Sequence, residues 1–119
     1  MKRDMDLIRE ILLAIEASEV TQGAIRLKLP GRTEDQVSYQ IKMLSQAGLI
    51  IATDMSSNDG FHWVPRSLTW EGHEFLDAAR DNTVWNKAMS KLKETAASAP
   101  FEIVKAVVIK TCKDYFGVP

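Results

Sequence analysis

The chain has 119 residues, of which 45% are hydrophobic and 26% charged, and its formal net charge is −1. These totals are typical of a single globular domain with one core, and they exclude a strongly basic protein that binds nucleic acid through its overall charge. No apolar run approaches the roughly 20 residues of a membrane span, and the N-terminal MKRDMD lacks the apolar region of a secretion signal, so we expect a cytoplasmic protein. Cys112 is the single cysteine, so we expect neither an intramolecular disulfide nor a cysteine-based metal site.

The first predicted element is a helix from Asp4 to Ser18. Its apolar residues recur at helical spacing and form one broad stripe: Met5, Leu7, Ile8, Ile11, Leu12 and Ile15. Asp4 and Asp6 lie at the N-terminal end, where carboxylates interact favourably with the helix dipole. We interpret this helix as a scaffold for the core.

The next segment, from Val20 to Leu29, has two interpretations. Apolar and basic residues alternate before Pro30 in a pattern typical of a strand: Ile25, Arg26, Leu27, Lys28 and Leu29. A strand here leaves only residues 29–32 for a short helix before the next element, so that helix would shrink to a turn. The alternative is a helix over residues 21–28. We favour the strand.

A helix and a hairpin follow between Thr33 and Leu68. Thr33 and Gln36 have the spacing of a capping box, and Gly48 is placed to end the helix in a left-handed conformation. Residues 49–55 and 61–68 are rich in strand-forming types and flank a run of turn residues, while Pro65 marks an edge position. A helix followed by a hairpin is the second half of a winged helix-turn-helix domain.

The last third of the chain is predicted to be helical. Thr69 caps a helix over residues 70–80, in which Gly72 is costly unless another backbone or ring comes close. Further helices are expected to about Ala97 and from Pro100 to Phe116.

The three tryptophans, Trp63, Trp70 and Trp85, could mark a binding surface, because Trp is enriched at binding hot spots. We interpret Trp70 and Trp85 as core residues that fill the junction between the hairpin and the later helices. Trp63 could be either a core residue or part of a binding surface, because a hairpin has one free face.

Two sequence blocks, MKRDMDLIREILLAIE and LTWEGHEFLDAARDNTVWNKA, together with the AGLI-to-DG hairpin between them, resemble a bacterial family that is common in prophages and known as a domain of unknown function. The similarity spans roughly residues 1–92. It implies a winged-helix-like fold and a regulatory role, and it implies no catalytic or ligand-binding residue. We therefore expect a mainly α protein with a small β-hairpin. Residues 1–80 would form a winged helix-turn-helix-like domain, and residues 81–119 a C-terminal helical extension that packs on it or on a second subunit.

Catalytic signatures are missing from the sequence. His73 has no second histidine four residues away, as a metalloprotease helix requires, and His62 stands alone on the hairpin. Glu71, Glu74 and Asp77 share part of one helix face, where a solvated surface with ion pairs is the default. We expect neither an enzyme nor a bound metal or cofactor.

The helix after Thr33 is the strongest functional candidate. Polar types that reach base edges or phosphates project from its outward face, and the candidate DNA-binding residues are Arg32, Ser38, Tyr39, Lys42, Gln46 and Arg66. Against this, the hairpin tip carries Asp54 and Asp59 and no cation. We favour a DNA-binding regulator of transcription; the alternative is a protein–protein interaction module with the same fold. A continuous positive strip along Arg32, Lys42 and Arg66 would favour double-stranded DNA as the partner.

The last helix predicts a homodimer. Its candidate interface stripe is Phe101, Val104, Val108, Cys112 and Tyr115, and further apolar residues widen the stripe beyond what one intramolecular contact needs. The alternative is that this helix is enclosed between residues 4–18 and 85–96 of its own chain.

Overall fold

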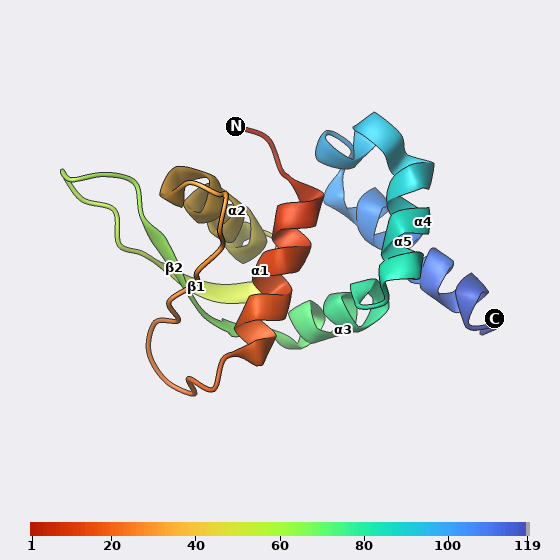
Figure 1. Cartoon of the computed structure of the whole chain (residues 1–119), viewed down its shortest axis with the longest axis horizontal. Coiled ribbons are helices and arrows are strands. Elements are labelled where there is room, and N and C mark those ends of the chain that lie inside the picture. The colour runs from red at the N-terminus through yellow and green to blue at the C-terminus, as the bar shows by residue number, and fades with distance from the viewer. Residues whose placement is uncertain (119) are drawn as a thin grey trace.

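The computed structural model describes residues 1–118, apart from the side chain of Ala97, and these residues form helices and one hairpin (Figure 1). In chain order the elements are α1 (Met5–Ala17), α2 (Glu34–Gln46), β1 (Ile50–Asp54), β2 (Trp63–Leu68), α3 (Trp70–Ala79), α4 (Asn82–Leu92), the short 3-10 helix η1 (Lys93–Ala97) and α5 (Phe101–Tyr115). The prediction of a mainly α chain with a small β-hairpin is confirmed. The regular part of α4 ends earlier than predicted, because Lys93 adopts a positive φ of 52°.

Helix α1 lies at the centre of the molecule, between the hairpin and the C-terminal helices (Figure 1). Asp4 is its N-cap and accepts a hydrogen bond from the Leu7 N–H at 3.1 Å. All six residues of the predicted apolar stripe are buried. They form the middle of one core cluster that reaches from α1 to Val104 and Val108 of α5. The predicted role as a core scaffold is confirmed.

Both ends of α2 follow the local rules that predicted them. Thr33 and Gln36 form the complete capping box, with hydrogen bonds of 3.0 and 3.1 Å. At the other end Gly48 has a φ of 78°, and the Leu49 N–H reaches back to the Leu44 carbonyl at 3.0 Å. This is the left-handed exit expected of a C-terminal glycine. It turns the chain directly into β1, which therefore packs against α2.

Strands β1 and β2 form a two-stranded antiparallel sheet, with an irregularity between Ile51 and Ala52. The predicted third strand at residues 25–29 is wrong: the segment is irregular, and its one main-chain bond to the sheet runs from the Ile25 N–H to the Pro65 carbonyl at 2.8 Å. The alternative helix over residues 21–28 is not formed either. The expected shrunken helix is confirmed as a turn, closed by the Arg32 N–H on the Leu29 carbonyl at 3.2 Å.

Polar side chains of α1 hold the corner between α3 and α4. The Arg9 guanidinium donates to the Ala79 and Arg80 carbonyls at 2.8 and 2.7 Å. Carbonyls at the C-terminal end of a helix have no hydrogen-bond partner within that helix, so Arg9 satisfies two of them. The Trp85 indole N–H donates to Asp6 at 2.7 Å. Trp85 is buried, so its predicted core role is confirmed.

Trp70 is not a core residue, and that prediction is wrong. Its side chain is 76% exposed. The face of α3 that meets the core starts at Gly72, whose Cα faces the Leu49 carbonyl. At about 100° per residue, Trp70 lies roughly 200° from Gly72 and projects into solvent. Trp63 is half-buried and packs against the core.

Candidate binding surface

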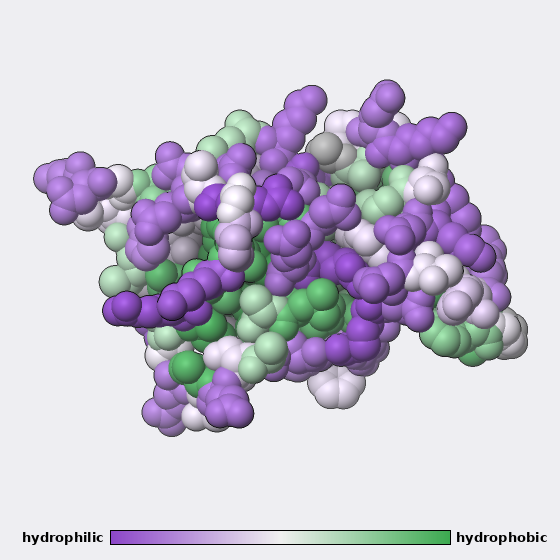
Figure 2. All heavy atoms as spheres, viewed as in Figure 1, coloured by the Kyte–Doolittle hydropathy of each residue, from purple (hydrophilic) through white to green (hydrophobic). Residues whose placement is uncertain are grey.

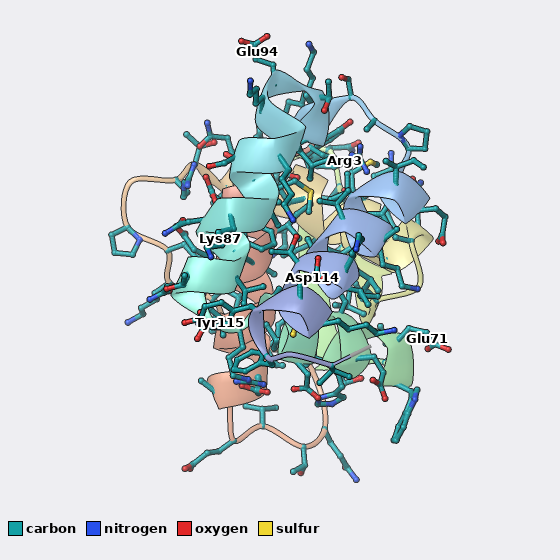
Figure 3. The ribbon with its side chains drawn as sticks, turned by 90° about the vertical axis from the view of Figure 1, so that its right-hand side faces the viewer. Arg3, Glu71, Lys87, Glu94, Asp114 and Tyr115 are labelled. Atoms are coloured by element: carbon teal, nitrogen blue, oxygen red, sulfur yellow. The ribbon has the colours of Figure 1, made fainter. Side chains whose placement is uncertain are left out.

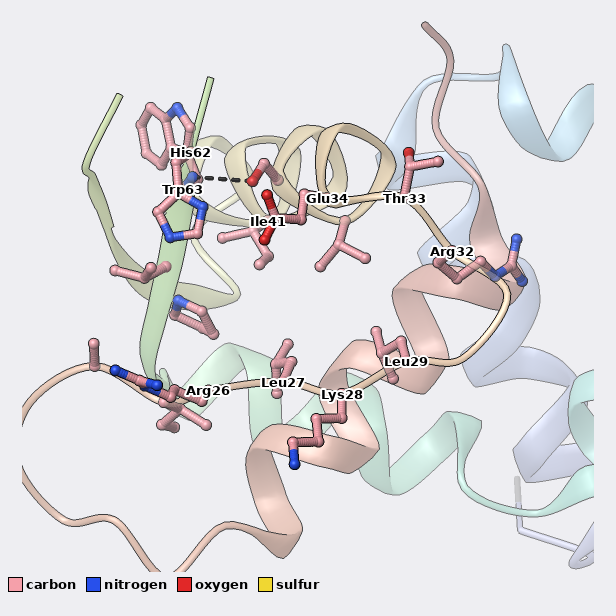
Figure 4. A pocket seen from close by; sticks show the side chains of 16 residues that line it. Arg26, Leu27, Lys28, Leu29, Arg32, Thr33, Glu34, Ile41, His62 and Trp63 are labelled. Atoms are coloured by element: carbon pink, nitrogen blue, oxygen red, sulfur yellow. Dashed lines mark hydrogen bonds between the residues drawn. The ribbon is translucent and has the colours of Figure 1, made fainter. Parts of the chain in front are cut away.

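The outward face of α2 differs from the predicted face at Ser38. Gln46 is exposed, and Tyr39 and Lys42 are half-buried. Ser38 is only 2% exposed, and its hydroxyl accepts a hydrogen bond from the Trp63 N–H at 3.1 Å (dashed in Figure 4). Ser38 therefore cannot contact DNA in this conformation, and its prediction as a DNA-binding residue is corrected: it ties α2 to the hairpin.

Sequence reasoning missed the role of Gln40, which is also buried. Its amide accepts from the Asp4 N–H at 3.0 Å and donates to the Lys2 carbonyl at 2.9 Å. The segment that leads into α1 therefore covers this side of α2. Periodicity within α2 gives no signal for that cover, because the covering residues come from the other end of the sequence.

The cations predicted to line a DNA surface are engaged with neighbours. Arg32 forms ion pairs with Asp4 at 3.1 Å and with Glu10 at 3.6 Å, and it points toward α1 (Figure 4). The Arg66 Nε donates to the Thr53 hydroxyl at 2.6 Å. The Lys42 ammonium lies 6.0 Å from the Phe61 ring centroid, within the range of a cation–π contact.

Carboxylates remain exposed on the same elements. Glu34 and Asp35 are exposed in the first turn of α2, and Asp54 and Asp59 are exposed on the hairpin. Hydrogen bonds from the side chain and backbone of Ser56 hold the pKa of Asp54 below its usual value, so this group is ionised at neutral pH. The cations Arg32, Lys42 and Arg66 therefore share this half of the molecule with four exposed carboxylates.

A groove of about 510 Å³ opens between the segment of residues 24–29, the start of α2 and β2 (Figure 4). Most of its lining residues are apolar: Ala24, Ile25, Leu27, Leu29, Val37, Ile41, Trp63, Val64 and Pro65. Leu27 and Leu29 point into it from one side, whereas Lys28 points away. Apolar side chains reach the surface in this part of the molecule between rows of hydrophilic ones (Figure 2).

The two walls of the groove differ in their main-chain hydrogen bonding. The N–H and C=O groups of Arg26, Leu27 and Lys28 make no hydrogen bond within residues 1–118. On the opposite wall, the Trp63 N–H is taken by Ser38, and Pro65 has no N–H and has its carbonyl taken by Ile25. One wall therefore has free main-chain groups, and the other has few.

The predicted dimer stripe on α5 is largely used within the chain. Val104 and Val108 are fully buried, and the Phe101 ring packs on Phe75 with centroids 5.4 Å apart. The prediction that these three residues form an intermolecular interface is therefore corrected. Helix α5 packs on α3 and α4, and not between α1 and α4.

The end of α5 carries the remaining stripe residues, Cys112 and Tyr115. Cys112 is half-buried, and Tyr115 is exposed beside Lys87, whose ammonium lies 5.3 Å from its ring centroid (Figure 3). The predicted division of the chain at residue 80 stays a prediction.

The described part of the chain has neither a cluster of metal ligands nor a membrane-spanning helix. Among residues 1–118, no three His, Cys, Asp or Glu side chains are grouped so that they could hold a metal ion. None of the helices in this part of the chain has the length and apolar character needed to cross a membrane.

These features define a class: a small helix-and-hairpin domain with an apolar surface groove beside its second helix. The chain belongs to the family described as "Hypothetical protein (DUF2513)", whose model matches residues 2–98. It is similar to an uncharacterized protein of Haemophilus influenzae, with 40% identity over 111 residues that cover 90% of this chain and 92% of that protein. No solved structure matches the chain. The predicted resemblance to a family of unknown function is confirmed.

Proposed function

We propose that this protein is a protein–protein interaction module that binds its partner through the half formed by α2, the hairpin and residues 24–29. The observation that carries the proposal is the apolar groove of about 510 Å³. Binding sites are typically concave and mostly apolar, with a few polar groups at the rim. The hairpin adds three exposed apolar side chains, Ile51, Met55 and Phe61. Exposed apolar residues that form a contiguous patch mark interaction sites.

The distribution of charge supports a protein partner over DNA. Binding to a duplex depends on Lys and Arg that replace counterions at the phosphates. Arg32 is already neutralised by Asp4 and Glu10, and exposed carboxylates at Asp54 and Asp59 flank the hairpin tip. Bringing these carboxylates near phosphates would cost electrostatic free energy.

DNA binding is the second candidate, and the exposed part of α2 supports it. Gln36 and Gln46 are exposed and Tyr39 and Lys42 are partly so, and these are types that contact base edges and phosphates. If the protein binds DNA, we further propose that it is related to winged-helix proteins, acts in transcription and has a prophage origin.

One pair of measurements separates the two functions. A labelled random DNA duplex is titrated with the protein at about 50 mM and about 200 mM salt, and in parallel the immobilised protein is used to select binders from a random peptide library. We expect selected peptides that bind the wild type and lose binding to Leu27→Glu, a change inside the groove. The matched control is Val118→Glu, a change of an exposed apolar residue after the end of α5.

Opposite results would overturn the proposal. Salt-dependent DNA binding that Lys42→Glu weakens, with a salt slope reduced by about one, would favour the DNA candidate. A library that yields no binder, or only binders that Leu27→Glu leaves unchanged, would exclude the groove as a protein-binding site.

A further inference from the structure

We infer, building on the proposed function, that the groove accepts an extended peptide that adds as a strand to residues 24–29, and that the partner's residues alternate between apolar and acidic. The inference specifies how the partner binds and which chemistry recognises it. It combines three independent observations: the free main chain, the alternating side chains and the unpaired cations of this segment.

The first observation is the free main chain. Arg26, Leu27 and Lys28 have N–H and C=O groups without a hydrogen-bond partner in the described part of the chain. An unpaired extended edge is a template for pairing with another chain, and peptide recognition by strand addition obtains its affinity from such groups. Strand β2 cannot serve in the same way, because Pro65 lacks an N–H and Ser38 occupies the Trp63 N–H.

The second observation is the alternation of side chains. Leu27 and Leu29 are half-buried and point into the groove, whereas Arg26 and Lys28 are exposed and the Lys28 side chain points away from the groove (Figure 4). An added strand places its own side chains on the same two faces and directly opposite these residues. Its groove-facing residues are therefore apolar and pack against the lining, which includes Val37 of α2.

The third observation concerns charge. Neither Arg26 nor Lys28 takes part in an ion pair among residues 1–118, so both cations are available to a partner. Opposite charges at facing positions of paired strands stabilise the pair. The outward residues of the partner strand are therefore acidic. Glu34, the carboxylate that lines the groove, belongs to α2 on the far wall and disfavours acidic residues on the groove side.

The test uses a fluorescein-labelled heptapeptide, Glu-Val-Glu-Val-Glu-Val-Glu, acetylated and amidated, and measures fluorescence polarisation against the full chain. A Lys-for-Glu version tests the charge. Two N-methylated versions, one methylated on every Glu and one on every Val, each keep the N–H groups of one strand edge only. We expect the Glu peptide to bind, the Lys peptide to bind more weakly, and one of the two N-methylated peptides to lose binding while the other retains it.

Charge reversal in the protein supplies the second arm. The double variant Arg26→Glu/Lys28→Glu alters two exposed residues and should weaken binding of the Glu peptide roughly three- to tenfold, because each cross-strand pair contributes little. The same variant should strengthen binding of the Lys peptide. Lys113→Glu, an exposed change at the end of α5, is the matched control and should leave both affinities unchanged.

The outcomes distinguish this inference from the proposed function. If library peptides bind and Leu27→Glu abolishes their binding, but both N-methylated forms still bind, strand addition is wrong while the interaction module stands. An unchanged preference for the Glu peptide in the double variant would overturn the acidic partner. If neither the library nor the heptapeptides yield a binder, both proposals fail.

Discussion

Replacing Gly72 by alanine should destabilise the protein, although the same change stabilises most helices. Gly72 lies in the first turn of α3, and a Cβ built on it would lie 2.0 Å from the Leu49 carbonyl oxygen. Real Cβ contacts are essentially never shorter than 3.0 Å, so α3 and the start of β1 would have to separate by at least 1.0 Å. The same Leu49 carbonyl accepts the Thr69 N–H at 3.0 Å, so the separation also strains the bond that precedes the helix.

The magnitude follows from three contributions. Overpacking of a filled site costs about 1–3 kcal/mol, and loss of the Thr69 hydrogen bond costs about 0.5–1.5 kcal/mol. The better helix propensity of alanine returns about 1 kcal/mol. Gly72→Ala should therefore lower the free energy of unfolding by about 0.5–3.5 kcal/mol.

Urea unfolding followed by tryptophan fluorescence and circular dichroism measures this change. The matched control is His73→Ala, at the exposed next position of α3, where a surface substitution should stay within about 0.5 kcal/mol of the wild type. A Gly72→Ala variant more stable than the wild type would show that the Leu49 backbone can move away at little cost, and the reasoning about close approach would be refuted.

Three further predictions concern the core, the pH dependence and self-association. Leu44→Ala should cost about 2–5 kcal/mol in urea unfolding, because Leu44 is buried on α2; a loss below about 0.5 kcal/mol would contradict the orientation of that helix. The hydrogen bond from Arg80 holds the pKa of Glu16 below the usual 4.5, so its stabilisation is present above pH 4.5 and lost as the pH falls below that value. Glu16→Gln should then destabilise the protein more at pH 7 than near pH 3, and an equal effect at both would contradict the ion pair. A homodimer through α5 now depends on its exposed residues Ile103 and Tyr115; sedimentation equilibrium should show it, with weakening by Ile103→Glu, and a monomer at about 100 μM would exclude it.

The features that the sequence predicted correctly are those that depend on neighbours along the chain. The capping box of Thr33, the exit at Gly48 and the stripe of α1 each involve residues within one or two turns. The close approach at Gly72 was also expected from its cost in a helix, although its partner, the Leu49 backbone, could not be identified in advance.

The errors occurred where burial depends on distant segments. The helical projection puts Ser38 near the outward face, and it gives no sign that the hairpin covers Ser38 through the Trp63 N–H. The sequence predicts a DNA contact for Arg32, because its ion-pair partners Asp4 and Glu10 are distant along the chain and cannot be recognised from it. The blocks that carry the family resemblance also bind one another across the fold, through Asp6 and Trp85. Periodicity reports which face of an element is apolar, but it does not report which element covers that face.

Residues 24–29 show both the strength and the limit of a sequence pattern. Their alternation predicts a strand, and the segment has the apolar face that such a strand needs. Strand formation also requires a partner with free main-chain groups, and the facing edge of β2 has lost most of them to Pro65 and to Ser38. The strand-forming pattern is therefore present without a partner inside the described chain. The same feature that made the prediction of an internal strand wrong makes this segment the most suitable place for a strand from another protein.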